Sequence, residues 1–177
     1  MNEQVEMFIS KEKIATRVKE LGALIMEDYK GEPLVVLGTL KGSFIFMADL
    51  VRELEGNITL EFIRVSSYGN STRPEDKIRF EQTYELDIVR KNVLLMEDII
   101  DTGKTVHFLL NYLKGFRPKS LKVCTLLDKP SRREVFGVIC DYVGFTLPDE
   151  FVVGYGLDYA QKYRNLPYVG ILRLKEV

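Results

Sequence analysis

Three carboxylates followed by a short turn are the residues best suited to chemistry in this chain. An apolar run, residues 93–96, leads directly into Glu97 and Asp98, and Asp101 follows after two more apolar residues. The sequence continues Thr-Gly-Lys-Thr at 102–105, which we expect to open a helix. Backbone N–H groups at a helix N-terminus lack partners within the helix and can bind a phosphate dianion. Because carboxylates accept hydrogen bonds from sugar hydroxyls and can bind Mg²⁺, the spacing favours a sugar phosphate as ligand.

A nucleotide-binding P-loop is the main competing interpretation of this turn. That motif requires a glycine five positions before its Gly-Lys-Thr, and Asp98 stands there instead, where its charge would repel a triphosphate. Taken singly, the residues also have structural interpretations: Asp101 or Thr102 could cap the helix, and Glu97 could be a solvated acid. Three carboxylates crowded at one strand end are costly without a ligand or a metal, so the whole string favours a binding site.

The elements that must position these residues alternate between strand and helix. Apolar stripes at helical spacing predict helices around 14–25, 47–54 and 106–113, with Ser10 as N-cap of the first and Gly56 and Gly115 closing the others. Strands are expected at 34–37, 58–65, 93–96, 121–127, 139–145, 151–155 and 168–173, and residues 77–84 could form a hairpin partner. This pattern predicts an α/β fold with a parallel β-sheet core flanked by helices. Ligands bind such sheets at the carboxyl ends of the strands, which selects the loops 38–43, 97–105 and 128–133.

Composition limits the class of protein. A chain of 177 residues fits one domain, 1–177, and its 46% hydrophobic and 29% charged residues exclude a disordered chain. Lys plus Arg number 25 and Asp plus Glu number 26, which argues against a surface that binds nucleic acid. Two cysteines, Cys124 and Cys140, and the single histidine His107 argue against a zinc cluster. With no signal-peptide pattern at the start and no membrane-spanning apolar run, we expect a cytoplasmic protein without membrane contact.

Several separated motifs resemble one family. Residues 95–105 resemble the phosphoribosyl pyrophosphate motif of the type I phosphoribosyltransferases, most closely the branch that uses hypoxanthine and guanine. Residues 40–43, 66–69, 127–130 and 151–159 match further motifs in the family's order, so the resemblance covers about 10–173. It implies the type I phosphoribosyltransferase fold, with a small hood over the C-terminal strand edge. It also implies Mg²⁺-dependent transfer of a phosphoribosyl group from phosphoribosyl pyrophosphate to a 6-oxopurine, with release of pyrophosphate, in purine salvage.

The resemblance assigns roles around the sugar. The 5′-phosphate would be wrapped by Asp101, Thr102, Gly103, Lys104 and Thr105. Glu97 and Asp98 would hold the ribose 2′- and 3′-hydroxyls, directly or through a metal ion, and Asp158 would bind a second Mg²⁺ through water. Asp101 is the catalytic candidate, either as general base toward purine N7 or as an electrostatic partner of the cationic ribose, and both roles stay open.

The resemblance also assigns residues to pyrophosphate and to the base. Lys41 and Gly42 would form the pyrophosphate loop, in which the Leu40–Lys41 peptide can be cis, and Arg164 would pair with pyrophosphate. Lys129 would contact the purine 6-oxo group, because an ammonium donates to a carbonyl and repels an amino group.

Two further groups complete the expected site. Phe151 would stack on the base, and Val152 would read it through backbone groups. Ser67 and Tyr68 lie in a polar loop, 66–76, that the family closes over the reacting centre to exclude water.

Alternatives remain within and outside this activity. Enzymes for adenine, orotate, uracil and xanthine share the central motif, but Lys129 and the Phe151-Val152 pair favour a 6-oxopurine such as hypoxanthine or guanine. A regulator that binds RNA is the other possibility, because the segment 114–133 is locally basic although the net charge is −1. We expect small-molecule substrates, no nucleic acid, and a homodimer or homotetramer as in the family.

Overall fold

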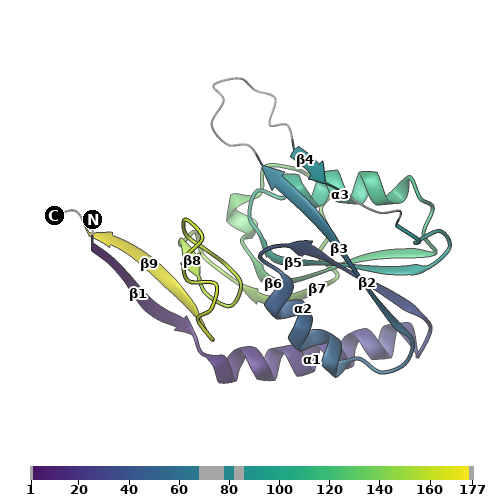
Figure 1. Cartoon of the computed structure of the whole chain (residues 1–177), viewed down its shortest axis with the longest axis horizontal. Coiled ribbons are helices and arrows are strands. Elements are labelled where there is room, and N and C mark those ends of the chain that lie inside the picture. Colours follow the sequence, from purple (N-terminus) through teal and green to yellow (C-terminus); the bar gives the residue numbers. More distant parts are fainter. Residues whose placement is uncertain (1, 68–77, 82–85, 176–177) are drawn as a thin grey trace.

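A twisted parallel sheet forms the centre of the protein (Figure 1). The computed structural model describes residues 2–67, 78–81 and 86–175. Within these residues the sheet order is β4-β3-β2-β5-β6-β7, in which β4 runs antiparallel to β3 and the remaining neighbours are parallel. The strands are β2 (Leu34–Leu40), β3 (Ile58–Ser67), β4 (Ile78–Glu81), β5 (Asn92–Ile100), β6 (Ser120–Asp128) and β7 (Tyr142–Thr146).

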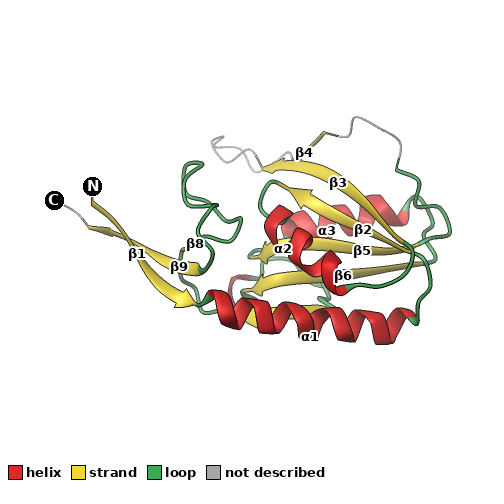
Figure 2. Cartoon of the chain, turned by 60° about the horizontal axis from the view of Figure 1, so that its bottom comes forward, coloured by secondary structure: helices red, strands yellow, loops and turns green. Residues whose placement is uncertain are grey.

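Helices cover both faces of this sheet, because its central strands are apolar on both sides. Figure 2 shows α1 (Lys11–Tyr29) and α2 (Phe44–Leu50) on one face and α3 (Lys104–Lys114) on the other. Leu34 and Val36 of β2 pack with α1 and α2, whereas Val35 and Leu37 pack with α3. This arrangement confirms the predicted fold class.

A second, antiparallel sheet joins the two ends of the chain. It contains β1 (Asn2–Ile9), β9 (Val169–Lys175) and the short β8 (Val152–Val153), in the order β1-β9-β8. Figure 1 shows this ribbon extending from the body of the molecule, with both termini at its far end. The loop between β8 and β9 folds back onto the main sheet: a Cβ at Gly156 would lie 2.1 Å from the Gly42 carbonyl oxygen. The predicted hood therefore covers the carboxyl ends of the parallel strands.

Two strands run further than their sequence patterns indicate. β2 continues to Leu40, beyond the expected end at residue 37, because it keeps its pairing with β3. β5 continues to Ile100, because Glu97 still pairs with Thr125 of β6. Glu97 and Asp98 are therefore strand residues, and the expectation that they lie in a loop is wrong.

Other boundaries differ for local reasons. The second helix ends at Leu50, and a 3₁₀ turn, Val51–Glu53, follows it, so Gly56 does not close that helix. β7 begins at Tyr142 rather than at residue 139, and β8 is shorter than expected. β1 is not predicted at all, because half of its residues are polar and its partner strand lies at the other end of the chain. No helix of the described residues is long and apolar enough to cross a membrane.

Candidate active site

The predicted sugar-phosphate residues line one pocket at the carboxyl end of β5. Its volume is about 180 Å³. The lining residues run from the strand end to the first turn of α3: Glu97, Asp98, Ile99, Ile100, Asp101, Thr102, Gly103, Thr105 and Val106. Lys104 is not among them, and its ammonium forms an ion pair with Glu134 at 2.8 Å. The contiguous motif thus forms a contiguous site, apart from that one lysine side chain.

The turn that opens α3 is fixed by the chain segment after β6. Gly103 is the N-cap residue with φ 81°, a conformation that favours glycine, and a Cβ there would lie 2.8 Å from Cδ of Arg133. The carbonyl of Thr102 accepts a hydrogen bond from the Glu134 amide at 3.0 Å. The first turn of α3 is therefore held at the pocket, where the N-terminus of a helix can bind an anion. The Lys104 amide also donates to the Thr102 hydroxyl at 3.4 Å.

Glu97 is a buried carboxylate that is only half satisfied. Its Oε2 accepts a hydrogen bond from the Thr39 hydroxyl at 2.6 Å, and its Oε1 has no partner among the described residues. Burial, and then the charge of Asp98, raise the pKa of Glu97 to about 8. Thr39 was not predicted as a site residue, although it stands directly before the pyrophosphate-loop motif on the neighbouring strand.

Asp98 is in close contact with the loop after β2. Its Oδ1 accepts a hydrogen bond from the Ile99 amide at 2.8 Å, and a Cβ at Gly42 would lie 1.5 Å from its Oδ2. Any side chain at position 42 would therefore displace the Asp98 carboxylate. Burial raises the pKa of Asp98 to about 6, against the opposing effects of backbone hydrogen bonds and Arg164. The Leu40–Lys41 peptide in this loop is cis, as the resemblance implies.

The residues expected at pyrophosphate come together between this loop and the hood. Arg164 forms an ion pair with Asp158 at 2.6 Å and donates to the Gly156 carbonyl at 2.7 Å. Lys41 donates to the side-chain oxygen of Gln161 at 3.2 Å, and the backbone N–H of Gln161 donates to the Asp158 carboxylate at 2.8 Å. Gln161 was not predicted, because it lies just beyond the motif 151–159 and only the fold brings it to Lys41.

Of the residues expected at the purine, Lys129 lies beside Asp101. Oδ2 of Asp101 lies 3.9 Å from Nζ of Lys129, and Oδ1 of Asp101 accepts a hydrogen bond from Nε of Arg132 at 3.2 Å. The Lys129 side chain is only 6% exposed, although a lysine in a loop is usually solvated. Phe151 is half exposed and meets Tyr159 edge to face, with ring centroids 5.7 Å apart.

Three remaining candidates are less informative. Val152 is buried in β8, beside Phe151. Ser67 is the last residue of β3, so the predicted loop 66–76 begins within a strand. Tyr68 and the rest of that loop lie outside the described residues, where the closing role stays a prediction.

The carboxylates predicted to hold Mg²⁺ do not form a metal cluster of their own. In the described ranges, no group of three or more His, Cys, Asp or Glu side chains is arranged to hold a metal ion. Asp158 is engaged by Arg164, while Glu97 retains an unsatisfied oxygen. Mg²⁺ at phosphate sites usually binds one or two carboxylates and completes its coordination with substrate oxygens and water. The residues present suit an ion bound in that way.

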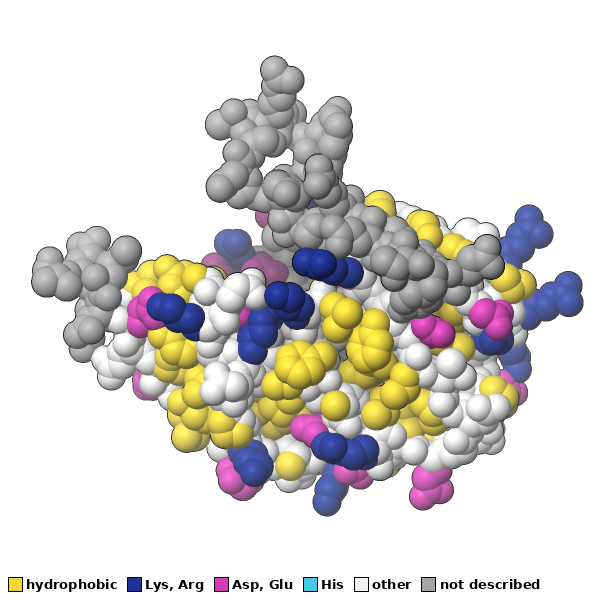
Figure 3. Space-filling view, viewed as in Figure 1, with side chains coloured by type: hydrophobic (Ala, Val, Ile, Leu, Met, Phe, Trp, Pro, Cys, Tyr) yellow, Lys and Arg dark blue, Asp and Glu magenta, His cyan; other side chains and the backbone are white. Residues whose placement is uncertain are grey.

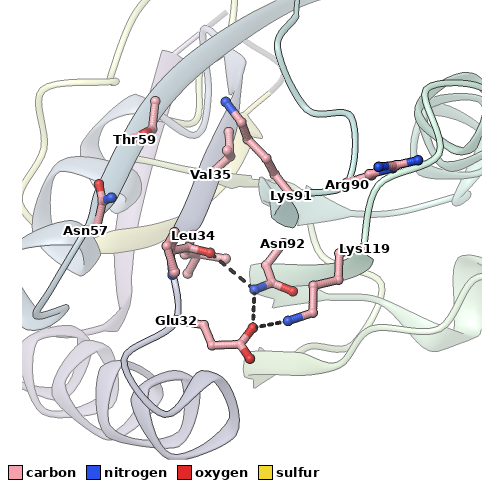
Figure 4. A pocket seen from close by; sticks show the side chains of 10 residues that line it. Glu32, Leu34, Val35, Asn57, Thr59, Arg90, Lys91, Asn92 and Lys119 are labelled. Carbon is pink, nitrogen blue, oxygen red and sulfur yellow. Dashed lines mark hydrogen bonds and ion pairs between the residues drawn. The ribbon is translucent and has the colours of Figure 1, made fainter.

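A larger pocket, of about 580 Å³, lies at the opposite edge of the sheet, by the amino ends of β2, β3 and β5. Figure 4 shows Glu32 joined to Asn92 and Lys119, at 2.8 and 2.5 Å, and Arg90 turned away from the pocket. Because these polar groups bind one another, this pocket offers less for a ligand than the smaller one at the carboxyl edge does.

An α/β sheet with carboxylates and a helix-opening turn at its carboxyl edge is the architecture of phosphate-binding α/β proteins. The sequence of residues 4–160 matches the family model of the phosphoribosyl transferase domain. The chain belongs to the phosphoribosyltransferase family, which confirms the resemblance.

Individual relatives agree over nearly the whole chain. The chain is 48% identical over 172 residues to a hypoxanthine phosphoribosyltransferase of Escherichia coli, covering 96% of each protein. It is 44% identical over 168 residues to a hypoxanthine-guanine phosphoribosyltransferase of Bacillus subtilis, covering 95% of this chain and 93% of that one. A crystal structure of a hypoxanthine-guanine phosphoribosyltransferase from Bacillus anthracis superimposes with a TM-score of 0.90 at 45% identity, covering 98% of this chain and 100% of that one.

Proposed function

We propose that this protein, as a single domain over 1–177, transfers the 5-phosphoribosyl group from phosphoribosyl pyrophosphate to hypoxanthine or guanine. The products are IMP or GMP and pyrophosphate, and the reaction belongs to purine salvage. The observation that carries the 6-oxopurine specificity is the pair formed by Asp101 and Lys129, whose charged atoms are 3.9 Å apart beside the sugar-phosphate pocket. The close relatives named above support the reaction class.

This pair suits one edge of a 6-oxopurine. The 6-oxo group and N7 are neighbours on that edge of the ring. Lys129 donates to the oxo group, and the carboxylate of Asp101 accepts the proton on N7. Adenine would present an amino group to the ammonium, so neither hydrogen-bond polarity nor charge would match.

The reaction exchanges one bond at the anomeric carbon for another. The bond from C1′ to pyrophosphate breaks, purine N9 forms the new bond to C1′, and the N7 proton leaves to Asp101 in its role as general base. Asp101 also faces the positive charge that develops on the ribose, and the two roles operate at the same place. Glu97 accepts a hydrogen bond from a ribose hydroxyl through its unsatisfied Oε1.

The 5′-phosphate and pyrophosphate would be held by different elements. The first-turn amides of α3 and the hydroxyls of Thr102 and Thr105 bind the 5′-phosphate. Lys41 and Arg164 bind pyrophosphate. Enzymes of this family generally use Mg²⁺ with phosphoribosyl pyrophosphate. Glu97 and Asp98 would hold one ion together with substrate oxygens, and Asp158 would hold a second through water; such ions would neutralise charge on the leaving pyrophosphate.

Binding of RNA has weaker support. The basic segment 114–133 would have to present a positive face. Four of its seven cations pair with acids of this chain, namely Lys119 with Glu32, Lys122 with Asp28, Arg132 with Asp101 and Arg133 with Asp128, and a fifth, Lys129, is buried. We therefore propose small-molecule substrates and no nucleic-acid partner.

We also propose that the enzyme is a cytoplasmic homodimer or homotetramer. Phe44 of α2 and Leu60 and Phe62 of β3 are 38–46% exposed. Figure 3 shows hydrophobic side chains gathered on the face that carries α2 and β3. A second copy of the chain would cover them. Light scattering of the purified protein measures the mass, and a monomer at micromolar concentration would contradict this proposal.

A steady-state assay tests the activity. Phosphoribosyl pyrophosphate and Mg²⁺ are supplied with hypoxanthine, guanine, xanthine or adenine, and pyrophosphate release is measured. We expect turnover with hypoxanthine or guanine and very little with adenine. Turnover of none of the four bases would contradict the proposed reaction, and equal use of adenine would contradict the assignment of Lys129.

A further inference from the structure

Arg132 links the base end of the site to the loop between β7 and β8. It is the last residue of the 3₁₀ turn Pro130–Arg132, and it entered the sequence interpretation only as one cation of the basic segment. Its Nε donates to Oδ1 of Asp101 at 3.2 Å, and its Nη1 lies 3.5 Å from Oδ2 of Asp149. Asp149 precedes Phe151 by two residues, so one guanidinium touches both the carboxylate and the chain segment expected at the purine.

We infer that Arg132 is a positioning residue for Asp101, and this inference rests on the proposed function. By occupying Oδ1, Arg132 keeps Oδ2 turned toward Lys129 and the purine edge. The distance of 3.9 Å between Oδ2 and the Lys129 ammonium is too long for a hydrogen bond. Both groups therefore retain their hydrogen-bonding capacity for the base, instead of satisfying each other.

The adjacent arginine supports this interpretation. Arg133 donates from Nη1 to the backbone carbonyl of Asp101 at 2.8 Å and forms an ion pair with Asp128. Arg133 thus fixes the backbone of Asp101, whereas Arg132 fixes the direction of its side chain. The planar guanidinium fork is suited to this task, because its donors have a fixed geometry.

The contribution of Arg132 to folding is expected to be small. The side chains of Arg132, Asp101 and Asp149 are 46%, 40% and 58% exposed, and exposed ion pairs contribute little to stability. An effect of Arg132 on turnover would therefore reflect the geometry of Asp101 rather than loss of the fold.

The first test compares Arg132 with Arg173, because both arginines pair with acids of the loop between β7 and β8. We expect Arg132→Ala to lower kcat for hypoxanthine by about tenfold to a hundredfold, because misplaced catalytic groups lose that much. The KM for phosphoribosyl pyrophosphate should change by less than about twofold, because among the described residues of the phosphate pocket the Arg132 side chain forms a hydrogen bond or ion pair only with Asp101. Arg132→Lys keeps the charge without the fork and should recover only part of kcat.

Arg173→Ala is the matched control. Arg173 is 50% exposed and pairs with Glu150, next to Asp149, without touching Asp101. Its kcat should stay within about twofold of the wild type, because an exposed pair contributes little. Equal losses in Arg132→Ala and Arg173→Ala would overturn the inference, because they would show a general effect on the loop.

A double-mutant cycle separates this inference from the proposed function. If Arg132 acts through Asp101, adding Arg132→Ala to Asp101→Asn should lower kcat by less than about twofold further. A full additional loss would overturn the positioning role. Wild-type kcat in Arg132→Ala alone, with a strong loss in Asp101→Asn, would overturn this inference and leave the proposed function intact. Wild-type kcat in Asp101→Asn would overturn the role of Asp101 itself.

Asp149→Asn keeps the test decisive if Arg132→Ala does not fold. It weakens only the ion pair between Arg132 and Asp149 and leaves the contact of Arg132 with Asp101 in place. We expect kcat to fall by about twofold to fivefold. That loss should disappear in the Asp101→Asn background. An Asp149→Asn enzyme with the same loss in both backgrounds would contradict the inference.

Discussion

Glu97 and Asp101 lie four residues apart, yet their environments are opposite. Glu97 is enclosed within β5, bound on one oxygen by Thr39, and its pKa is raised to about 8. Asp101 stands 40% exposed beyond the strand end, between Lys129 and Arg132. Because environment decides what a carboxylate can do, the enclosed Glu97 is suited to hydroxyl or metal binding, and the more exposed Asp101 is accessible to the base. Two acids of one motif thus differ in function because one lies within β5 and the other lies beyond its end.

The largest effect on kcat is expected for Asp101, the more exposed of the two carboxylates. Asp101→Asn keeps the shape of the side chain but cannot accept the N7 proton, so kcat should fall by about 10²–10⁴-fold. The KM for phosphoribosyl pyrophosphate should change far less, because the phosphate is held by backbone amides. Stopped-flow or steady-state kinetics with hypoxanthine measures both. Near-wild-type turnover would remove the acid-base role and with it the functional difference between the two carboxylates.

At the buried end, the expected effect is on stability rather than on turnover. The folded-state pKa of Glu97 is raised above the ordinary value of 4.5 to about 8, so between these values the folded protein binds more protons than the unfolded chain. Stability should therefore fall as pH rises from 5 to 8, by about 3–4 kcal/mol from this group in the free enzyme. Glu97→Gln cannot ionise and should lose less stability over that range.

Urea unfolding at pH 5 and pH 8 measures this difference. Glu27→Gln, which changes an exposed glutamate of α1, is the control and should follow the wild type at both pH values. If Glu97→Gln also followed the wild type, burial of Glu97 would not be the source of the pH dependence. The contrast with Asp101 would then lose its electrostatic basis.

Lys129 tests what surrounds the exposed carboxylate. Lys129→Ala removes the donor to the 6-oxo group, and kcat/KM for hypoxanthine should fall by about tenfold to thirtyfold, as for loss of one hydrogen bond to a charged group. The low activity with adenine should not fall, because that base gains nothing from an ammonium. An equal loss with both bases would mean that Lys129 supports Asp101 or the fold instead of reading the purine.

The sequence reveals the parts of the site that are contiguous along the chain. The motif 97–105 carries its own strand end, turn and helix start, so its chemistry is visible in the order of its residues. The contacts of Thr39 with Glu97 and of Lys41 with Gln161 span 58 and 120 positions. Only the fold creates them, and neither Thr39 nor Gln161 stands out by type. For the same reason the alternation of strands and helices is predictable from the sequence, whereas β1, which pairs with β9 at the other end of the chain, is not.

Strand ends were misplaced for a related reason. The apolar run of β5 ends at Met96, but the backbone pairing with β6 continues to Ile100. Side-chain hydrophobicity reports burial and is silent about backbone hydrogen bonds, so the acids at 97 and 98 were assigned to a loop. Their position inside the strand is also what buries Glu97 and gives it the environment that distinguishes it from Asp101.

The smallest effect is expected at Lys104, the one residue of the motif that does not line the pocket. Its ammonium pairs with Glu134 at 2.8 Å, and both side chains are about half exposed. If backbone amides and hydroxyls hold the 5′-phosphate, Lys104→Ala should raise the KM for phosphoribosyl pyrophosphate by less than about twofold. Thr105→Val removes a hydroxyl that lines the pocket and should raise it by about tenfold, because hydrogen bonds to charged groups are stronger. A larger effect of Lys104→Ala than of Thr105→Val would mean that the lysine leaves Glu134 for the phosphate when substrate binds. Phosphate binding at this turn would then depend on a side-chain charge, as the proposed chemistry at Asp101 does.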